Sequence, residues 1–285
     1  MESRRTKINW FPGHMTKALR EMQKQSANVD CFVYVLDARI PLASINPVYD
    51  SIFNNKPVLY VLNKADMVPE NELNKWFAFY SKKSKCITSN STINGGNKKF
   101  ISALKELNNE KIERYRAKGV RKTIHAMVVG IPNCGKSTLI NSIVSKKRAA
   151  TGNRPGVTRG PQWVNVDQYV DLLDTPGTLY PDFSDQVKAS HLAMVGSIRD
   201  QILDNKILAL DILDYLKNEF LDNLLKKYTF VNAEMDVEEM FLAVGKSKGL
   251  LIKGGDIDEG RTSIAIIQDF RKQAFGKIML ERYDG

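Results

Sequence analysis

One stretch of the chain has the residue types needed to hold a polyphosphate. Residues 130–137, GIPNCGKS, match the pattern GxxxxGK[ST], in which backbone N–H groups cradle phosphate oxygens at the start of a helix. Lys136 would reach the β- and γ-phosphates, and the Ser137 hydroxyl would hold Mg²⁺. An apolar run precedes the pattern and the helix-forming STLINSIV follows it. The sequence therefore predicts a phosphate loop, the alternative being a ligand-free turn between a strand and a helix.

A second motif would complete the γ-phosphate end of this site. Asp174-Thr175-Pro176-Gly177 ends the apolar run YVDLL. A carboxylate here supports Mg²⁺, in our interpretation through water, and the glycine amide meets the γ-phosphate. Thr158 lies between the two motifs, where a threonine can close over Mg²⁺; a plain surface loop is the alternative for it. DTPG alone is a common turn, so this prediction depends on the phosphate loop before it.

A third motif has the chemistry to read the base. Asn63-Lys64-Ala65-Asp66 follows the apolar run VLYVL. The Asp66 carboxylate can accept hydrogen bonds from N1 and N2 of guanine, which adenine cannot donate, so discrimination can reach on the order of ten-thousand-fold. We expect Asn63 to tie this loop to the phosphate loop and the Lys64 stem to lie on the base. The motifs together predict GTP rather than ATP.

A weaker signal for the base is TSNS at residues 88–91, which follows the short apolar run KCI. It occupies the place of a loop whose backbone contacts guanine O6. The expected nucleotide contacts are therefore Asn63, Lys64, Ala65, Asp66, Ser89, Asn90, Ser91, Asn133, Cys134, Gly135, Lys136, Ser137, Thr138, Asp174 and Gly177.

The order of these motifs differs from that of a Ras-like GTPase, in which the phosphate loop comes first. Here the base motif precedes it by about seventy residues. A Ras-like domain that is cut after DTPG and rejoined through its former termini by residues 97–123 has this order. Such a change leaves the packing of the sheet intact, because the termini of these domains lie close together at the surface. The chain then leaves the core directly after DTPG, and we expect residues 178–190 to report hydrolysis to the C-terminal part of the chain.

The elements that must position the motifs alternate between apolar runs and amphipathic stretches. Near-continuous apolar runs at 29–39, 56–66 and 124–130 are typical of buried parallel strands, and residues 165–177 predict a hairpin and strand. This alternation indicates an α/β doubly wound fold. Helices are expected at 13–25, 43–54, 70–83, 97–117, 208–228, 238–249 and 259–275.

The pattern changes near residue 185, after which amphipathic helices dominate. We predict a circularly permuted Ras-like P-loop GTPase domain with an N-terminal amphipathic helix at residues 1–185. A smaller all-helical domain is predicted at residues 186–285.

The charge of the chain is concentrated in its first part. The net charge is +10; residues 1–185 hold 28 Lys/Arg and 16 Asp/Glu, whereas residues 186–285 hold 14 and 16. A basic surface suggests a polyanionic partner such as nucleic acid, although it can also serve solubility alone. Candidate phosphate contacts, or else plain solvated surface, are Lys98, Lys99, Arg121, Lys122 and residues 146–148.

Composition excludes several other classes. Three scattered cysteines and three histidines argue against a disulfide framework and a zinc site, and favour a reducing cytoplasm. No apolar run is long enough to span a bilayer, and the N-terminus, MESRRTKINW, lacks the apolar core of a secretory signal.

The motifs together resemble one family. WFPGHM (10–15), DARIP (37–41), GIPNCGKSTLIN (130–141), RPGVT (154–158) and KSKGLLIKGG (246–255), in this permuted order, are similar to ribosome biogenesis GTPase A, the YlqF family, over nearly the whole chain. The resemblance implies a cytoplasmic bacterial factor, or an organellar relative, that binds the rRNA and proteins of the maturing large ribosomal subunit. Its hydrolysis of GTP would accompany late assembly of that subunit and the release of the factor. The resemblance further implies that the helical domain contacts RNA. We expect a monomer without membrane contacts.

The resemblance also implies roles for single residues. His14 matches the family's proposed catalytic histidine, the alternative being that His14 and Trp10 anchor the N-terminal helix. Asn133 matches an asparagine that in related GTPases helps to hold K⁺. Many GTPases place a water-orienting glutamine after the glycine of DTPG; this chain has Thr178 there, where the family carries a hydrophobic residue.

The predicted reaction is attack of water on the γ-phosphate of GTP. Lys136, Mg²⁺ on Ser137 and Thr158, and K⁺ would stabilise the developing charge. Because the glutamine is missing, we expect turnover alone of roughly 10⁻⁴–10⁻³ s⁻¹, as for unassisted Ras, and stimulation by ribosomal particles. Three other functions stay open: a GTP-dependent binding switch, a P-loop ATPase or small-molecule kinase, and a signalling GTPase with protein partners.

Overall fold

The computed structural model describes residues 13–91, 97–144, 161–180 and 184–283. These residues form two compact units. The first unit holds the described residues up to 180 together with 279–283, and the second holds residues 184–278. Each unit has buried hydrophobic residues of its own.

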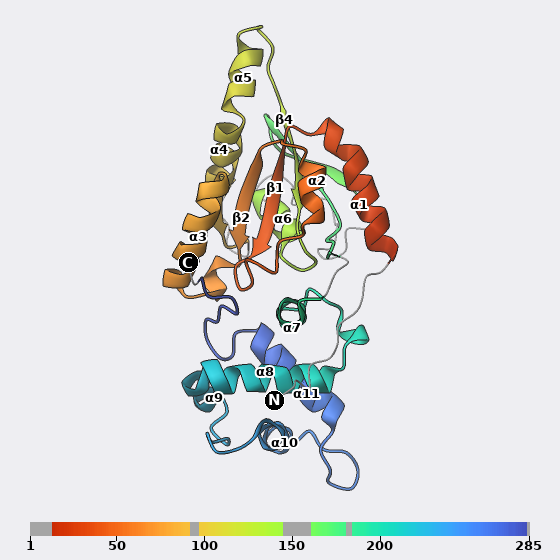
Figure 1. Cartoon of the computed structure of the whole chain (residues 1–285), viewed down its shortest axis with the longest axis vertical. Coiled ribbons are helices and arrows are strands. Elements are labelled where there is room, and N and C mark those ends of the chain that lie inside the picture. Colours follow the sequence, from red (N-terminus) through yellow and green to blue (C-terminus); the bar gives the residue numbers. More distant parts are fainter. Residues whose placement is uncertain (1–12, 92–96, 145–160, 181–183, 284–285) are drawn as a thin grey trace. The chain divides into compact units, whose positions relative to one another are not determined.

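A six-stranded sheet forms the centre of the first unit (Figure 1). The strand order is β3-β2-β1-β4-β6-β5, and every pairing is parallel except that of β5 with β6. Every residue of β1 is buried, as expected for a strand covered on both faces. The predicted α/β fold with a terminal hairpin is therefore confirmed. The strands are β1 (Cys31–Asp37), β2 (Val58–Asn63), β3 (Cys86–Ser89), β4 (Ile124–Val129), β5 (Gln162–Asp167) and β6 (Val170–Asp174).

The helices of the first unit other than α5 pack on this sheet, and the predicted helix at 70–83 is confirmed as α3. The predicted helix at 43–54 is shorter, because Pro47 stands at its N-cap and fixes the start. The predicted helix at 97–117 is interrupted at Asn108, whose side chain donates to the backbone carbonyl of Leu104 and so competes with the helical hydrogen bonds. The helices are α1 (Gly13–Gln25), α2 (Val48–Phe53), α3 (Glu70–Lys83), α4 (Asn97–Leu107), α5 (Asn109–Arg116) and α6 (Lys136–Val144), with short 3₁₀ turns η1 (Ser26–Asn28) and η2 (Ala65–Met67).

The parallel strands bring the predicted motifs to one edge of the sheet. Asn63 ends β2, Ser89 ends β3 and Asp174 ends β6, while the phosphate loop follows β4. The register pairs Asn63 with both Asp37 and Ser89. Ligands of open α/β sheets bind at this carboxyl edge, so the topology alone assembles residues that are far apart in sequence.

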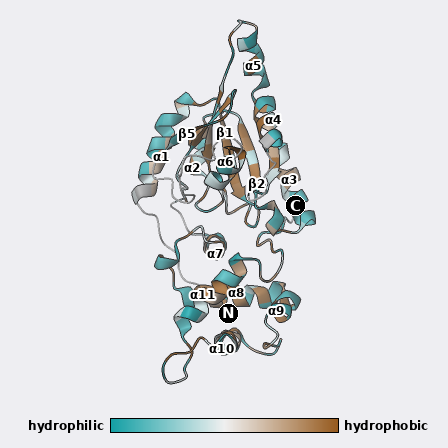
Figure 2. Ribbon diagram, turned by 180° about the vertical axis from the view of Figure 1, so that it is seen from behind, coloured by the Kyte–Doolittle hydropathy of each residue, from teal (hydrophilic) through white to brown (hydrophobic). Residues whose placement is uncertain are grey.

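The second unit is helical, as predicted, and its first helix is α7. Asp185, Asp204 and Asp258 accept hydrogen bonds from backbone N–H groups at helix starts, and Asp236 forms a capping box with Glu239. Figure 2 shows hydrophobic colours along the strands of the first unit and hydrophilic colours on the outward faces of helices in both units. The helices are α7 (Gln186–Met194), α8 (Asn205–Glu219), α9 (Leu221–Lys227), α10 (Val237–Ser247) and α11 (Glu259–Arg271), with η3 (Asp200–Ile202).

The last described segment returns to the first unit, which nothing in the sequence indicated. Leu280 donates its N–H to the carbonyl of Arg39 at 2.9 Å, and the Trp76 indole donates to the carbonyl of Glu281 at 2.8 Å. The Glu281 carboxylate accepts the backbone N–H groups of Leu42 and Ala43. Residues 279–283 therefore fasten the loop that comes after β1.

No helix within the described residues is both long and apolar enough to cross a membrane.

Candidate nucleotide-binding site

The phosphate loop requires glycine at two positions. A Cβ on Gly130 would lie 2.4 Å from the carbonyl oxygen of Val35, and the backbone there has φ +154°. A Cβ on Gly135, where φ is +98°, would lie 2.3 Å from the Asn63 side-chain nitrogen. A side chain at either glycine would displace the loop, so the spacing in GxxxxGK results from backbone geometry.

Lys136 presents a buried positive charge at the centre of the loop. Its side chain is 7% exposed, and its Nζ donates to the carbonyls of Gly130 at 3.1 Å and Ile131 at 2.9 Å. None of the carboxylates in the described part of the chain forms an ion pair with it. A buried ammonium without a counter-ion is costly, so the position fits an anionic ligand such as a polyphosphate. A Cβ on Gly177 would come within 2.9 Å of this Nζ, which places the DTPG backbone beside the same charge.

Ser137 and Asp174 place a hydroxyl and a carboxylate oxygen side by side at the predicted magnesium position. Ser137 Oγ donates to Asp174 Oδ2 at 2.8 Å, and the next residue, Thr175, is fixed by a 2.6 Å hydrogen bond to the carbonyl of Val128. Hydroxyl and carboxylate oxygens are the donors that Mg²⁺ prefers, so the residues present fit this ion. Thr158, the third predicted ligand, lies outside the described residues.

The loop after β2 is tied to the phosphate loop, as the sequence predicted. Asn63 Nδ2 donates to the carbonyl of Cys134 at 2.8 Å, and Ser91 Oγ donates to Asn63 Oδ1 at 2.6 Å. Lys64 Nζ donates to the carbonyl of Asn133 at 2.6 Å. The base motif and the phosphate motif, about seventy residues apart in sequence, thus border one site.

A buried carboxylate that sequence reasoning missed supports this arrangement. Asp37, at the end of β1, is fully buried and accepts two hydrogen bonds from the Arg39 guanidinium, at 2.9 and 2.7 Å, and one from Lys64 Nζ at 2.7 Å. Burial by itself would raise the pKa of Asp37, but the two positive charges hold that pKa well below its usual range. The signal in the sequence was an aspartate directly after an apolar run, in DARIP.

The remaining predicted contacts border the same loops. Asp66 is exposed within η2, where its carboxylate is accessible to a base, and Asn133 is exposed with φ +59°. Cys134 is fully buried, and burial raises the pKa of its thiol, so this cysteine packs rather than reacts. Ala65 and Asn90 are partly exposed, and Thr138 is exposed in the first turn of α6.

Thr178 is turned into the core rather than toward a nucleotide. It is fully buried, its hydroxyl lies 2.7 Å from the Tyr49 hydroxyl, and its carbonyl accepts from Asn46 Nδ2 at 3.4 Å. Because the position is interior, a hydrophobic residue fits there equally well, and Tyr49 satisfies the hydroxyl that threonine adds. Thr178 therefore does not replace the water-orienting glutamine.

The first turn of α1 lies beside the residues that come after DTPG. The buried Met15 side chain accepts the backbone N–H of Leu179, with 3.4 Å between the sulfur and the nitrogen. Leu179 is two residues beyond Gly177. His14 directly precedes Met15, and its side chain is outside the described part of the structure.

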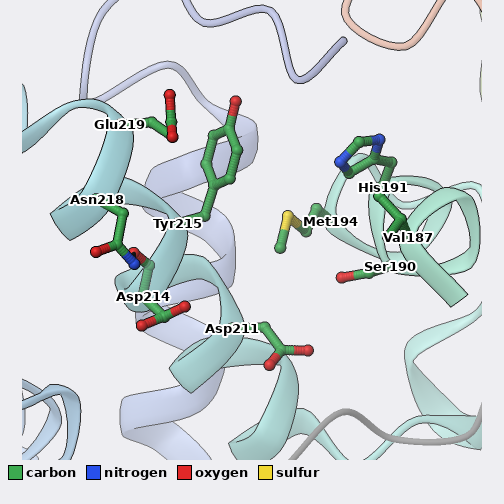
Figure 3. A pocket seen from close by; sticks show the side chains of 9 residues that line it. All are labelled: Val187, Ser190, His191, Met194, Asp211, Asp214, Tyr215, Asn218 and Glu219. Atoms are coloured by element: carbon green, nitrogen blue, oxygen red, sulfur yellow. Dashed lines mark hydrogen bonds between the residues drawn. The ribbon is translucent and has the colours of Figure 1, made fainter. Parts of the chain in front are cut away.

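The helical unit has a hollow of its own, of about 230 Å³. Figure 3 shows that α7 and α8 supply facing walls. Three of its side chains are carboxylates that repel phosphate, so the hollow does not suit a nucleotide. It is lined by Val187, Ser190, His191, Met194, Asp211, Asp214, Tyr215, Asn218 and Glu219.

Known proteins share both the sequence and the fold. Residues 125–246 match the family model described as a 50S ribosome-binding GTPase. The chain is 41% identical to ribosome biogenesis GTPase A of Bacillus cereus over 96% of this chain and 93% of that protein. Two solved structures of YlqF each match 93% of this chain with a TM-score of 0.64. The GDP-bound structure is 25% identical and is matched over 100% of its own length. The GNP-bound structure from T. maritima is 26% identical and is matched over 98% of its own length. The chain therefore belongs to the ribosome biogenesis GTPase A family of circularly permuted GTPases.

Proposed function

We propose that this protein hydrolyses GTP while bound to the maturing large ribosomal subunit, and that hydrolysis is coupled to late maturation and to its own release. The hydrogen bond from Asn63 to the carbonyl of Cys134 carries the proposal, because it joins a guanine-reading loop to a phosphate loop. The name of the B. cereus relative and the matched family description support a ribosomal partner. A cytoplasmic monomer fits this role.

The residues of the chain divide the chemical work by position. The loop amides and Lys136 hold the triphosphate and offset its charge, while Asp66 accepts from the guanine edge. Ser137 and Asp174 would hold Mg²⁺, with Thr158 as a further ligand; bound there, the ion supplies positive charge to the β- and γ-phosphate oxygens. Asn133 would contribute to a K⁺ site on the exposed side of the loop.

Thr178, which stands where many GTPases carry the water-orienting glutamine, is engaged by Tyr49 and does not position the attacking water. We assign this role to His14. Its neighbour Met15 contacts Leu179, so the helix that carries His14 begins beside the γ-phosphate motif. Turnover of the isolated protein is then slow, and the large subunit accelerates it by fixing the histidine.

The segment after Gly177 carries the signal out of the site. The γ-phosphate is the only group that distinguishes GTP from GDP, and Gly177 adjoins the Lys136 ammonium that would hold it. Residues 178–190 lead from there into α7. Hydrogen exchange of the helical unit should therefore differ between protein loaded with a GTP analogue and protein loaded with GDP; identical protection would refute this coupling.

The decisive experiment measures GTP hydrolysis with and without purified large ribosomal subunits, in KCl and in NaCl. We expect slow turnover alone, strong stimulation by subunits, and a larger rate in potassium. His14→Ala should abolish the stimulation and leave GDP affinity unchanged. Lys17→Ala, an exposed change on the same helix, is the matched control. Full stimulation of His14→Ala would remove His14 from the mechanism, and absence of any stimulation would remove the large subunit.

A further inference from the structure

A short helix of the first unit exists without any contribution to the core. No residue of α5 is buried, and Figure 1 shows that this helix extends beyond the amino ends of the strands. A helix that is polar on all sides gains little from packing. Residues 109–123, which contain α5 and lead into β4, carry six Lys/Arg and two Asp/Glu. The segment therefore presents positive charge at the end of the unit opposite the nucleotide site.

A buried carboxylate holds this segment in place. Asp30, just before β1, forms ion pairs with Lys111 of α5 at 2.5 Å and with Lys122 at 2.9 Å, and accepts the backbone N–H of His125 at 2.8 Å. Two of the six positive charges are thus used to fasten both ends of the segment. Residues 109–123 are thus held in place before a partner binds, which lowers the conformational entropy lost on binding.

The four other charges face solvent. Arg114, Arg116, Lys118 and Arg121 are all exposed. Arg116 approaches Glu113 at 3.5 Å, with 79% and 54% of the two side chains exposed, and such surface pairs are readily exchanged for another anion. Within the described residues the other three have no ion pair.

Aromatic rings are interleaved with these charges. Arg121 lies 5.3 Å from the ring centre of Tyr169 and Lys105 lies 4.7 Å from it, while Arg114 lies 5.9 Å from the ring of Tyr115. Trp163 is 47% exposed on the edge strand β5. Trp163 is linked to the same surface through His125. The rings of His125 and Trp163 have centres 5.3 Å apart, and His125 Nδ1 lies 3.8 Å from Asp30 Oδ2.

We propose that this surface, which we call the linker face, binds RNA. Guanidinium and ammonium groups contact phosphates, and partly exposed rings stack on unpaired bases. An acidic protein would use the charges but gains no base stacking from the rings, and the vesicle measurement below distinguishes RNA from an anionic membrane, which also accepts aromatic rings. The inference rests on the proposed function, since it names the surface that meets the rRNA. The linker face consists of Arg114, Arg116, Lys118 and Arg121 with the rings of Tyr115, Tyr169 and Trp163.

The position of the linker face makes it separable from hydrolysis. Its four charged residues lie at the amino ends of the strands, and β4 has six residues, so about 20 Å of strand at 3.3 Å per residue separates these charges from the phosphate loop. Trp163 pairs with Leu173 and lies nearer the opposite edge. Changing the four charges should leave GDP affinity and basal GTP hydrolysis at the wild-type level.

The test uses the full chain loaded with a non-hydrolysable GTP analogue. Binding to purified large ribosomal subunits and to deproteinised large-subunit rRNA is measured from 50 to 300 mM KCl. Each lost phosphate contact lowers the slope of log K against log salt by about 0.7–0.9, so the linker-face variant should show a slope shallower by about 3. Its affinity at 100 mM salt should fall by at least about tenfold. The linker-face variant is Arg114→Gln, Arg116→Gln, Lys118→Gln and Arg121→Gln.

A second variant separates stacking from charge. Trp163→Ala should weaken RNA binding by about tenfold, since stacking of one base contributes roughly 1–3 kcal/mol, and should leave the salt slope unchanged. The control variant removes four exposed lysines elsewhere on the same unit and should bind like the wild type. It is Lys17→Gln, Lys24→Gln, Lys82→Gln and Lys83→Gln.

The outcomes are distinct. Wild-type affinity and slope in the linker-face variant, or an equal loss in the control variant, would overturn the RNA assignment and leave the proposed function standing. Failure of the wild type itself to bind subunits would instead end the proposed function. If the linker-face variant lost binding to phosphatidylglycerol vesicles but kept wild-type RNA binding, the surface would be a membrane surface and RNA would be refuted as the partner.

Discussion

Replacement of Glu281 by alanine should weaken nucleotide binding, although this residue lies far along the chain from every nucleotide motif. Its carboxylate accepts the N–H groups of Leu42 and Ala43. Hydrogen bonds to a charged group contribute about 1.5–3 kcal/mol each. Ala43 is fully buried, so its N–H finds no water as a substitute. We expect the free energy of unfolding of the first unit to fall by about 3 kcal/mol.

The effect reaches the base through a short series of contacts. The fastened loop carries Arg39, whose guanidinium binds the buried Asp37, and Asp37 holds Lys64 Nζ against the phosphate loop. If half of the lost unfolding free energy also appears as weaker nucleotide binding, the affinity for GDP falls about tenfold, since about 1.4 kcal/mol corresponds to one factor of ten. GDP and GTP should be affected equally, because none of these contacts involves the γ-phosphate.

Two measurements on the full chain separate stability from binding. Urea unfolding gives the stability change, and titration with a fluorescent GDP gives the affinity. Glu281→Gln retains one carbonyl oxygen as acceptor and should lose about a third as much, while Lys277→Ala, at an exposed position four residues earlier, should stay within about 0.5 kcal/mol. A Glu281→Ala protein with lower stability and unchanged GDP affinity would refute the connection from the C-terminal segment to the base loop.

Three further substitutions test the site. The pKa of Asp37 is depressed in the folded protein, so the ionised carboxylate stabilises the fold fully at neutral pH and loses this contribution as pH falls below the ordinary pKa of 3.8. Urea unfolding from pH 7 to pH 3 should therefore show that the difference in free energy of unfolding between wild type and Asp37→Asn shrinks on the acid side. Asn63→Ala removes two buried hydrogen bonds and should weaken GDP and GTP alike by about 10–100-fold in calorimetry, with selectivity for guanine over adenine retained. Asp66→Asn should lose guanosine nucleotides and gain xanthosine nucleotides in the same assay, because the xanthine C2 carbonyl accepts from an amide; retained guanine preference would show that another residue reads the base.

Features that depend on residues close together in the chain were predictable from the sequence, whereas features that depend on distant residues were not. The phosphate loop, the base motif and α3 were predictable because each depends on residues adjacent in the chain, such as the glycines that permit close backbone approach. The tie from Asn63 to Cys134 was predictable only because a known arrangement of motifs requires it. The helix start at Pro47 and the interruption at Asn108 were misjudged, since apolar periodicity reveals neither a proline that fixes a helix start nor the non-helical backbone of Asn108.

Contacts of long sequence separation escaped the sequence altogether. The carboxylate of Glu281 meets an amide 239 residues away, and nothing in its local sequence marks it as buried. Asp37 reads as the polar end of a strand until the structure shows that two cations converge on it. Thr178 was recognised as a departure from the family, but its buried partner Tyr49 could be found only from the packing of α2 against the loop after DTPG.

The permutation gives the helical unit two covalent junctions with the carboxyl edge of the sheet, and the two junctions border different parts of the nucleotide. The chain enters the helical unit after Gly177, beside Lys136. After the helical unit the chain reaches Glu281, which accepts a backbone N–H of the loop that carries Arg39. Arg39 binds Asp37, and Asp37 binds Lys64. A ligand shifts an equilibrium only through contacts that differ between two states. We therefore expect the entry junction to respond to the difference between GTP and GDP, and the exit junction to respond to whether the base site is occupied.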